Sequence, residues 1–231
     1  MKNIDFFDAA SEKEEKREGK TADRVPKEKK AIRSLTVIGQ IEGHTTLSDG
    51  QKVTKYEEVL PSLVALEEDD TVGGLLVLLN TVGGDVEAGL CMAEMIASLK
   101  KPTVSLVLGG GHSIGVPLAV SARRSFIVPS ATVTLHPVRI SGTVIGAEQT
   151  YQYLEGVQNR INRFILTHSE IGEGRLRELM TAPDKLSSDI GTVLDGYEAV
   201  REGLIGSIGG VKEAVKSLRD MIEKEACGEK I

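Results

Sequence analysis

Cysteine, histidine and long apolar runs are all scarce in this chain of 231 residues. Its two cysteines, Cys91 and Cys227, form no CxxC pair, and its four histidines do not cluster with them. These absences argue against a disulfide framework and a metal site, so we expect reduced thiols, no metal and no cofactor. We expect Cys91 on a buried helix and Cys227 in a charged tail. No apolar run reaches the ~20 residues of a membrane span, which argues against an integral membrane protein.

Charge and composition favour a compact cytoplasmic protein. The formal net charge of −6 gives no reason to expect a nucleic-acid partner. The N-terminus is charged throughout and has no apolar segment typical of a signal peptide. With 40% hydrophobic residues, a chain of this length can bury one sizeable core. We therefore expect a cytoplasmic location and a single main domain.

The charged residues divide the chain unevenly. Residues 1–33 carry ten Lys or Arg and eight Asp or Glu, with little apolar content. Such a segment buries too little surface to order itself, so we predict a flexible N-terminal tail. The alternative is a short docking motif around Ile4, Phe6 and Phe7. We expect one domain over residues 34–220 and a charged C-terminal tail over residues 221–231.

Strand-like and helix-like segments alternate from residue 35 onward. Apolar strands are expected at 35–38, 74–80, 103–108, 126–128 and 132–135, and helices at 56–67, 86–96 and 147–168. Asp85 is placed to cap the second of these helices. This alternation predicts an α/β fold with parallel strands joined by helical crossovers.

Ser113 occupies the most informative position of the chain. It follows the apolar run 103–108 and three glycines, and it precedes small and apolar residues that suit a buried helix. At such a strand-to-helix junction, the free N–H groups of the first helical turn can stabilise a developing negative charge. This is the environment that a nucleophilic serine needs for acyl transfer.

Two further segments complete the pattern. One is an apolar strand that breaks at Gly83 and Gly84, where the backbone can approach a ligand closely. The other is an alternating strand that ends in His136 followed by Pro137. An imidazole titrates near neutrality and can take the proton of a serine hydroxyl. The three glycines before Ser113 are not a phosphate loop, because no Lys-Ser or Lys-Thr follows them at the required spacing. Gly83 and Gly84 lack the third glycine of a dinucleotide fingerprint.

These three segments together resemble the ClpP-like serine peptidases of the Clp protease/crotonase superfamily, and most closely their translocation-enhancing subgroup. The resemblance runs from about residue 35 to about residue 215 and implies a spiral of β-β-α units. It implies Ser113 as nucleophile, His136 as general base, and the N–H groups of Gly84 and Ile114 as oxyanion donors. The interval from Gly84 to Ser113 needs no gap, whereas the interval to His136 is two residues shorter than the family pattern.

The third member of the triad departs from the family pattern. Alignment on the run 196–205 places the family's aspartate on Gly191. Asp189 lies two residues earlier, on the same face of an extended segment, and is our candidate for orienting His136. Asp184 and Asp195 are the neighbouring alternatives. His112 also departs from the family, which has a small residue there; it either crowds the cleft or forms a local hydrogen bond.

The resemblance implies the partners as well. A segment from Val138 to Gly142 would bind an extended peptide as an added strand. The helix 147–168 corresponds to the handle helix that joins two rings, although an ordinary packed helix is equally compatible with its apolar spacing. The expected partners are a peptide or protein substrate, further copies of the chain in a ring of heptameric type, and an ATP-dependent unfoldase or the secretion machinery.

Three functions are compatible with these residues. The first is a serine endopeptidase that cleaves unfolded or small proteins. The second is a scaffold on the same fold that assists preprotein translocation without cleavage. The third is a crotonase-type acyl-CoA enzyme, which would leave Ser113 and His136 unexplained. The pairing of Ser113 with His136 favours the peptidase.

Overall fold

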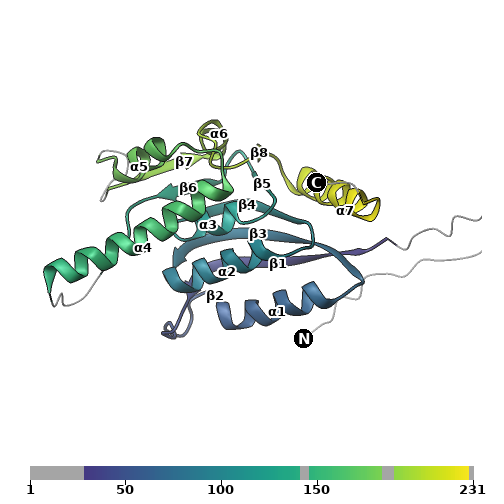
Figure 1. Ribbon diagram of the computed structural model, residues 1–231, viewed down its shortest axis with the longest axis horizontal. Helices are drawn as coiled ribbons and strands as arrows, with labels where there is room; N and C mark the ends of the chain where they lie inside the picture. The colour runs from purple at the N-terminus through teal and green to yellow at the C-terminus, as the bar shows by residue number, and fades with distance from the viewer. Residues whose placement is uncertain (1–28, 141–145, 184–189, 229–231) are drawn as a thin grey trace, which may run out of the picture.

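The structure is a computed structural model that describes residues 29–140, 146–183 and 190–228. Within these residues, one eight-stranded sheet is covered by helices (Figure 1). The strands are β1 (Ala31–Glu42), β2 (Val53–Lys55), β3 (Val72–Gly84), β4 (Thr103–His112), β5 (Arg124–Ile127), β6 (Thr132–Leu135), β7 (Thr192–Asp195) and β8 (Ser207–Ile208). The helices are α1 (Tyr56–Glu68), α2 (Val86–Ser98), α3 (Gly115–Val120), α4 (Ala147–His168), α5 (Glu173–Thr181), α6 (Gly196–Arg201) and α7 (Val211–Ala226).

The sheet is mostly parallel and divides at β4. Its main path runs β2-β1-β3-β4-β5-β8, and every pair along it is parallel. The first part of β4 pairs with β5 through Val104–Val107, whereas its last residues, Gly110–His112, pair with β6. The pair β6–β7 is antiparallel. The predicted α/β class with parallel strands is confirmed, and Ser113 follows the strand at which the sheet divides.

Helices cover both faces of the sheet. Leu75, Val77 and Leu79 of β3 face the main core, which also contains buried residues of α1 to α6. Leu76 points to the other face and packs with Leu218 of α7. Successive residues of a strand point to opposite faces, so a strand covered on both sides is apolar at consecutive positions. This is why β3 carries an unbroken apolar run.

The structure adds detail to three expectations on boundaries and burial. Strand β1 begins at Ala31, inside the predicted N-terminal tail, because it pairs there with β3. Helix α7 crosses the predicted boundary at residue 221, and Met221 is buried against the sheet. Cys91 is exposed, because the buried stripe of α2 contains its neighbours Leu90 and Met92 instead. The alternative docking motif at residues 4–7 lies outside the described residues.

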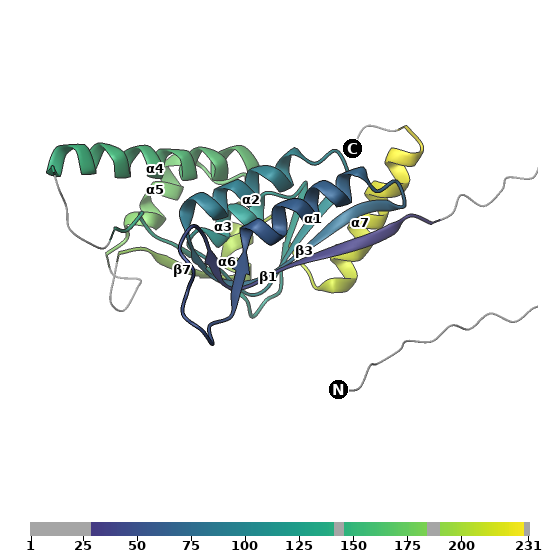
Figure 2. The same ribbon diagram turned by 90° about the horizontal axis from the view of Figure 1, so that it is seen from below.

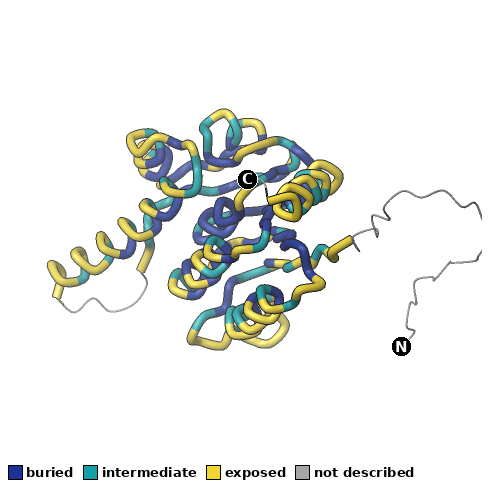
Figure 3. Tube along the Cα trace, turned by 45° about the vertical axis from the view of Figure 1, so that its right-hand side comes forward, coloured by how far each residue is buried: buried dark blue, intermediate teal, exposed yellow. Residues whose placement is uncertain are grey.

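Helix α4 has the predicted bounds but is buried along only part of its length. Its buried residues are Val157, Ile161, Phe164 and Ile165, while Tyr151 near its start is 67% exposed. Figures 2 and 3 show this first half of α4 projecting from the body of the protein. His168 stacks on Phe164, with ring centroids 4.1 Å apart, and its Nδ1 lies 2.8 Å from the Phe164 carbonyl oxygen. His168 is therefore a packing residue of α4.

Candidate active site

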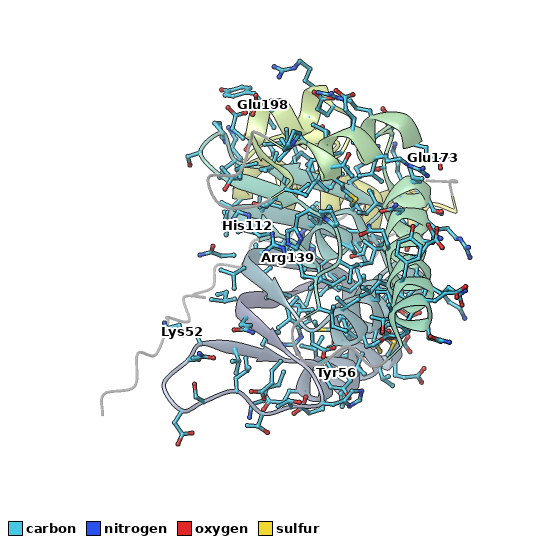
Figure 4. All side chains as sticks on the ribbon, turned by 90° about the vertical axis from the view of Figure 1, so that its left-hand side faces the viewer. Lys52, Tyr56, His112, Arg139, Glu173 and Glu198 are labelled. Carbon is cyan, nitrogen blue, oxygen red and sulfur yellow. The ribbon has the colours of Figure 1, made fainter. Side chains whose placement is uncertain are left out.

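A single cleft brings together most of the candidate residues. Its volume is about 370 Å³ and its lining includes Gly84, Ser113, Ile114, His136 and Val138. Strands β3 and β4 are parallel neighbours, so the residues that follow them meet at the same edge of the sheet. Figure 4 views the molecule from this side, with Arg139, another residue of the lining, labelled. Gly142 and Asp189 lie outside the described residues.

The backbone of Ser113 is held in an unusual conformation. Its φ of 57° is the only positive value at a non-glycine residue in the described part of the chain. Its N–H donates to the Thr134 carbonyl of β6 (2.9 Å), and its own carbonyl accepts the N–H of Val116 in α3 (3.0 Å). A left-handed conformation costs about 1–2 kcal/mol at a residue with a side chain, and such strain is concentrated at functional sites. The two hydrogen bonds fix Ser113 at the mouth of the cleft.

Gly83 lies directly against Ser113. A Cβ atom on Gly83 would be 2.8 Å from the Ser113 Cβ and 2.7 Å from the His112 carbonyl oxygen. The N–H of Gly83 donates to Thr81 Oγ1 (3.0 Å), and this hydroxyl donates in turn to the Gly39 carbonyl (2.6 Å). Because Gly83 also has a φ of 89°, only glycine fits this position without strain.

Two backbone N–H groups are candidates for binding an anion in the cleft. The N–H of Asp85 donates to the Ile41 carbonyl of β1 (3.0 Å). Gly84, the residue before Asp85, ends β3. Within the described residues, the N–H of Ile114 has no hydrogen-bond partner. Both groups belong to residues that line the cleft.

The ring of His136 is oriented by the backbone of the next residue. Its Nδ1 lies 2.7 Å from the carbonyl oxygen of Pro137. A carbonyl only accepts, so Nδ1 is the donor and Nε2 of the neutral ring is left as an acceptor. In the described part of the chain, no hydrogen bond joins Ser113 to His136.

No carboxylate is found beside His136 in the described residues. The antiparallel β6–β7 ladder ends at the pair Leu135–Thr192. His136 follows Leu135 in sequence, and Gly191 precedes Thr192. Gly191 has no side chain, and its φ of 139° disfavours one. Asp195 pairs with Thr132 instead, and its carboxylate caps α6 by accepting the N–H of Glu198 (2.8 Å). The alternative that Asp195 orients His136 is therefore wrong. Asp184 and Asp189 lie outside the described residues.

His112 forms a local hydrogen bond. Its Nδ1 lies 2.8 Å from Thr134 Oγ1, because the two residues are paired across β4 and β6. The ring lies over Gly110, where a Cβ atom would be 2.5 Å from Nε2. Burial lowers the pKa of His112 below its usual range. Thr134 lines the cleft but His112 does not, so local hydrogen bonding, one of the two alternatives for this histidine, is what the structure shows.

Sequence reasoning missed Gln158 of α4. Its Oε1 accepts the N–H of Val138 at 2.8 Å, two residues after His136. Gln158 lies on a helix whose local pattern marks only apolar positions, and nothing near it in sequence signals a contact with the histidine segment. The pairing depends on where α4 packs in the tertiary structure.

Comparison with known proteins identifies the family. The sequence profile of the Clp protease family matches residues 28–212. The chain belongs to the Clp protease family. It is 53% identical over 198 residues to the translocation-enhancing protein TepA of Halalkalibacterium halodurans, covering 86% of this chain and 77% of that protein.

The ATP-dependent Clp protease proteolytic subunits are more distant relatives. The subunit of Leuconostoc citreum is 26% identical over 119 residues, which cover 48% of this chain and 59% of that subunit. That of Protochlamydia amoebophila is 28% identical over 102 residues, covering 43% of this chain and 50% of that subunit. The resemblance noted in the sequence is thus confirmed at the level of the family, and the sheet of mostly parallel strands agrees with the ClpP-like fold. None of the helices in the described residues has the length and apolar content that crossing a membrane requires.

Proposed function

We propose that this protein is a ClpP-like serine endopeptidase that cleaves unfolded or small proteins through an acyl-enzyme. Ser113 acts as nucleophile and His136 as general base, and the N–H groups of Gly84 and Ile114 bind the oxyanion. The observation that carries the proposal is the convergence of these four residues on one cleft. The left-handed backbone of Ser113 supports it further.

The proposed reaction uses the free nitrogen of His136. Nε2 takes the proton of the Ser113 hydroxyl while Oγ attacks the carbonyl carbon of the scissile peptide bond. The negative charge that develops on the carbonyl oxygen is stabilised by the two N–H groups; removing one such donor typically costs about 10²–10³ in rate. His136 then gives the proton to the leaving amine, and water, activated in the same way, releases the acyl group from Ser113.

The orientation of His136 is the open element of this mechanism. We propose Asp189 as the acid that accepts from Nδ1 when the site is competent. With the Pro137 carbonyl as partner, the imidazolium formed during catalysis faces a neutral acceptor rather than a carboxylate. In a serine protease, loss of the proper acid lowers kcat by about 10⁴, so a site without one would turn over slowly.

Substrate binding and assembly extend the proposal. The segment from Val138 to Gly142 pairs with an extended peptide, and the chain assembles into a heptameric ring in the cytoplasm. The relatives from Leuconostoc citreum and Protochlamydia amoebophila are named as proteolytic subunits of an ATP-dependent Clp protease, which supports an assembly of several chains. An unfoldase or the secretion machinery would deliver the substrate.

Labelling with a fluorophosphonate probe tests the proposal, with intact mass as the readout. We expect one adduct per wild-type chain, none on Ser113→Ala, and only slow, uncatalysed labelling of His136→Ala. Native mass spectrometry of the same samples tests the ring. Lack of any adduct on folded, assembled wild-type protein would refute the peptidase.

The second candidate is a scaffold that assists preprotein translocation without cleavage. Two observations favour it within the described residues: no hydrogen bond joins Ser113 to His136, and no carboxylate lines the cleft. The name of the relative from Halalkalibacterium halodurans, a translocation-enhancing protein, favours it as well. The scaffold predicts that Ser113→Ala supports secretion in cells as well as the wild type does.

A further inference from the structure

The segment that carries His136 separates two cavities. On one side lies the active-site cleft. On the other lies a second cavity of about 420 Å³, lined in part by Tyr151, Leu154 and Arg177. Pro137, Val138 and Met180 line both cavities. With space on each side, this segment depends on a small number of contacts to stay in place.

Gln158 provides a specific contact to this segment. Its Oε1 accepts the N–H of Val138 at 2.8 Å. Its Nε2 donates to Asn162 Oδ1 at 2.8 Å and lies 3.4 Å from Met180 Sδ. Because an amide has one accepting and one donating end, these partners fix which end faces Val138. The side chain is thus held by α4 and α5 and holds the strand-to-loop segment in turn.

The path from Gln158 to the imidazole is short and stiff. Val138 follows Pro137, whose ring restricts its own φ. The carbonyl of Pro137 accepts from Nδ1 of His136. This carbonyl and the Val138 N–H belong to one rigid peptide unit. A shift of the N–H therefore moves the backbone next to His136, whether Nδ1 bonds the Pro137 carbonyl or Asp189. Without Gln158, that half-buried N–H loses its partner, which favours such a shift.

We propose that Gln158 is a positioning residue for His136, through which the packing of α4 sets the reactivity of Ser113. This inference rests on the proposed peptidase function. The contact does not touch the reacting atoms, so its effect is on how often His136 reaches the position from which it can take the serine proton. Small displacements of a catalytic group lower the rate steeply.

The test compares fluorophosphonate labelling rates of four proteins. Gln158→Leu removes the acceptor, and we expect labelling to slow about tenfold. Gln158→Glu retains an acceptor for the Val138 N–H, and Asn162 can turn its amide to donate to it, so we expect most of the rate to return. Gln152→Leu is the matched control: it makes the same change on an exposed site of α4, where Gln152 bonds only Glu148 within the described residues. Melting temperature and native mass are measured on each.

A double-mutant cycle separates positioning from a general structural role. In a His136→Ala background, Gln158→Leu should leave the slow labelling rate unchanged, because there is no base left to position. Equal labelling rates of the wild type and Gln158→Leu would overturn this inference and leave the proposed function unaffected. So would a loss explained by unfolding or by loss of assembly. Absence of labelling in the wild type would overturn the proposed function and this inference with it.

Discussion

Gly83 leaves room for Ser113 because it has no side chain, and Gly83→Ala tests this directly. The new Cβ would lie 2.8 Å from the Ser113 Cβ and 2.7 Å from the His112 carbonyl oxygen, whereas ordinary contacts begin at 3.4 Å. The serine must therefore retreat by about 0.6 Å, or the glycine loop must move by a similar distance. Either movement changes the distance between the nucleophile and a bound carbonyl.

Two costs add up in this variant. A left-handed alanine costs about 1–2 kcal/mol, and overpacking adds about 1–3 kcal/mol. We expect the free energy of unfolding to fall by about 2–5 kcal/mol. Because a misplacement of about 1 Å can cost 10²-fold in rate, we expect fluorophosphonate labelling of Ser113 to slow by about ten- to a hundredfold.

Gly50→Ala is the matched control. Gly50 has a φ of 90°, almost the 89° of Gly83, and no heavy atom lies within 4 Å of its Cβ position. This variant bears the cost of the backbone conformation alone, so labelling should be unchanged in the folded protein. Urea titration gives the free energy of unfolding and labelling kinetics give the reactivity. If both variants lose the same stability and label equally fast, the close approach of Gly83 to Ser113 is refuted.

Three further predictions concern stability. His112→Asn keeps a hydrogen-bond partner for Thr134 but removes the histidine whose pKa is lowered by burial. The free energy of unfolding of the wild type is highest above the unfolded histidine pKa of ~6.5 and falls as the pH drops below it. Urea midpoints of the variant should therefore depend less on pH. Glu87→Gln breaks a bidentate, half-exposed ion pair with Arg160, and should cost under about 1 kcal/mol, less at high salt. Leu118→Ala, fully buried in α3, should cost about 3 kcal/mol in the same titration.

The limits of the long strands were predicted less well than their existence. The apolar runs at 74–80 and 103–108 indicated buried strands, but β3 continues to Gly84 and β4 to His112. Glycine-rich ends have low intrinsic strand propensity. They are held in the sheet by pairing with residues distant in sequence, as Gly110–His112 are by β6. A single sequence carries little local signal for such pairing.

The buried face of each helix was predictable where the periodicity was strong. Helix α1 buries Val59, Leu63 and Leu66, as their spacing indicates. The apolar spacing of α4 gave its bounds, yet could not show that Tyr151 would be exposed, because burial depends on what lies opposite. The same limit explains Cys91, which lies among buried residues in sequence but on the outer side of α2.

The sequence by itself determined the α/β class, the family and the candidate roles of Ser113, His136 and Gly84. The class follows from the alternation of apolar strands and helices, and the family and the roles follow from the resemblance of three segments to the ClpP-like serine peptidases. Only the tertiary structure decided that these residues share a cleft, that Gly83 contacts the nucleophile, that Asp195 caps a helix and that Gln158 holds the histidine segment. Such contacts join residues far apart along the chain, and their geometry is set by the packing of whole strands and helices.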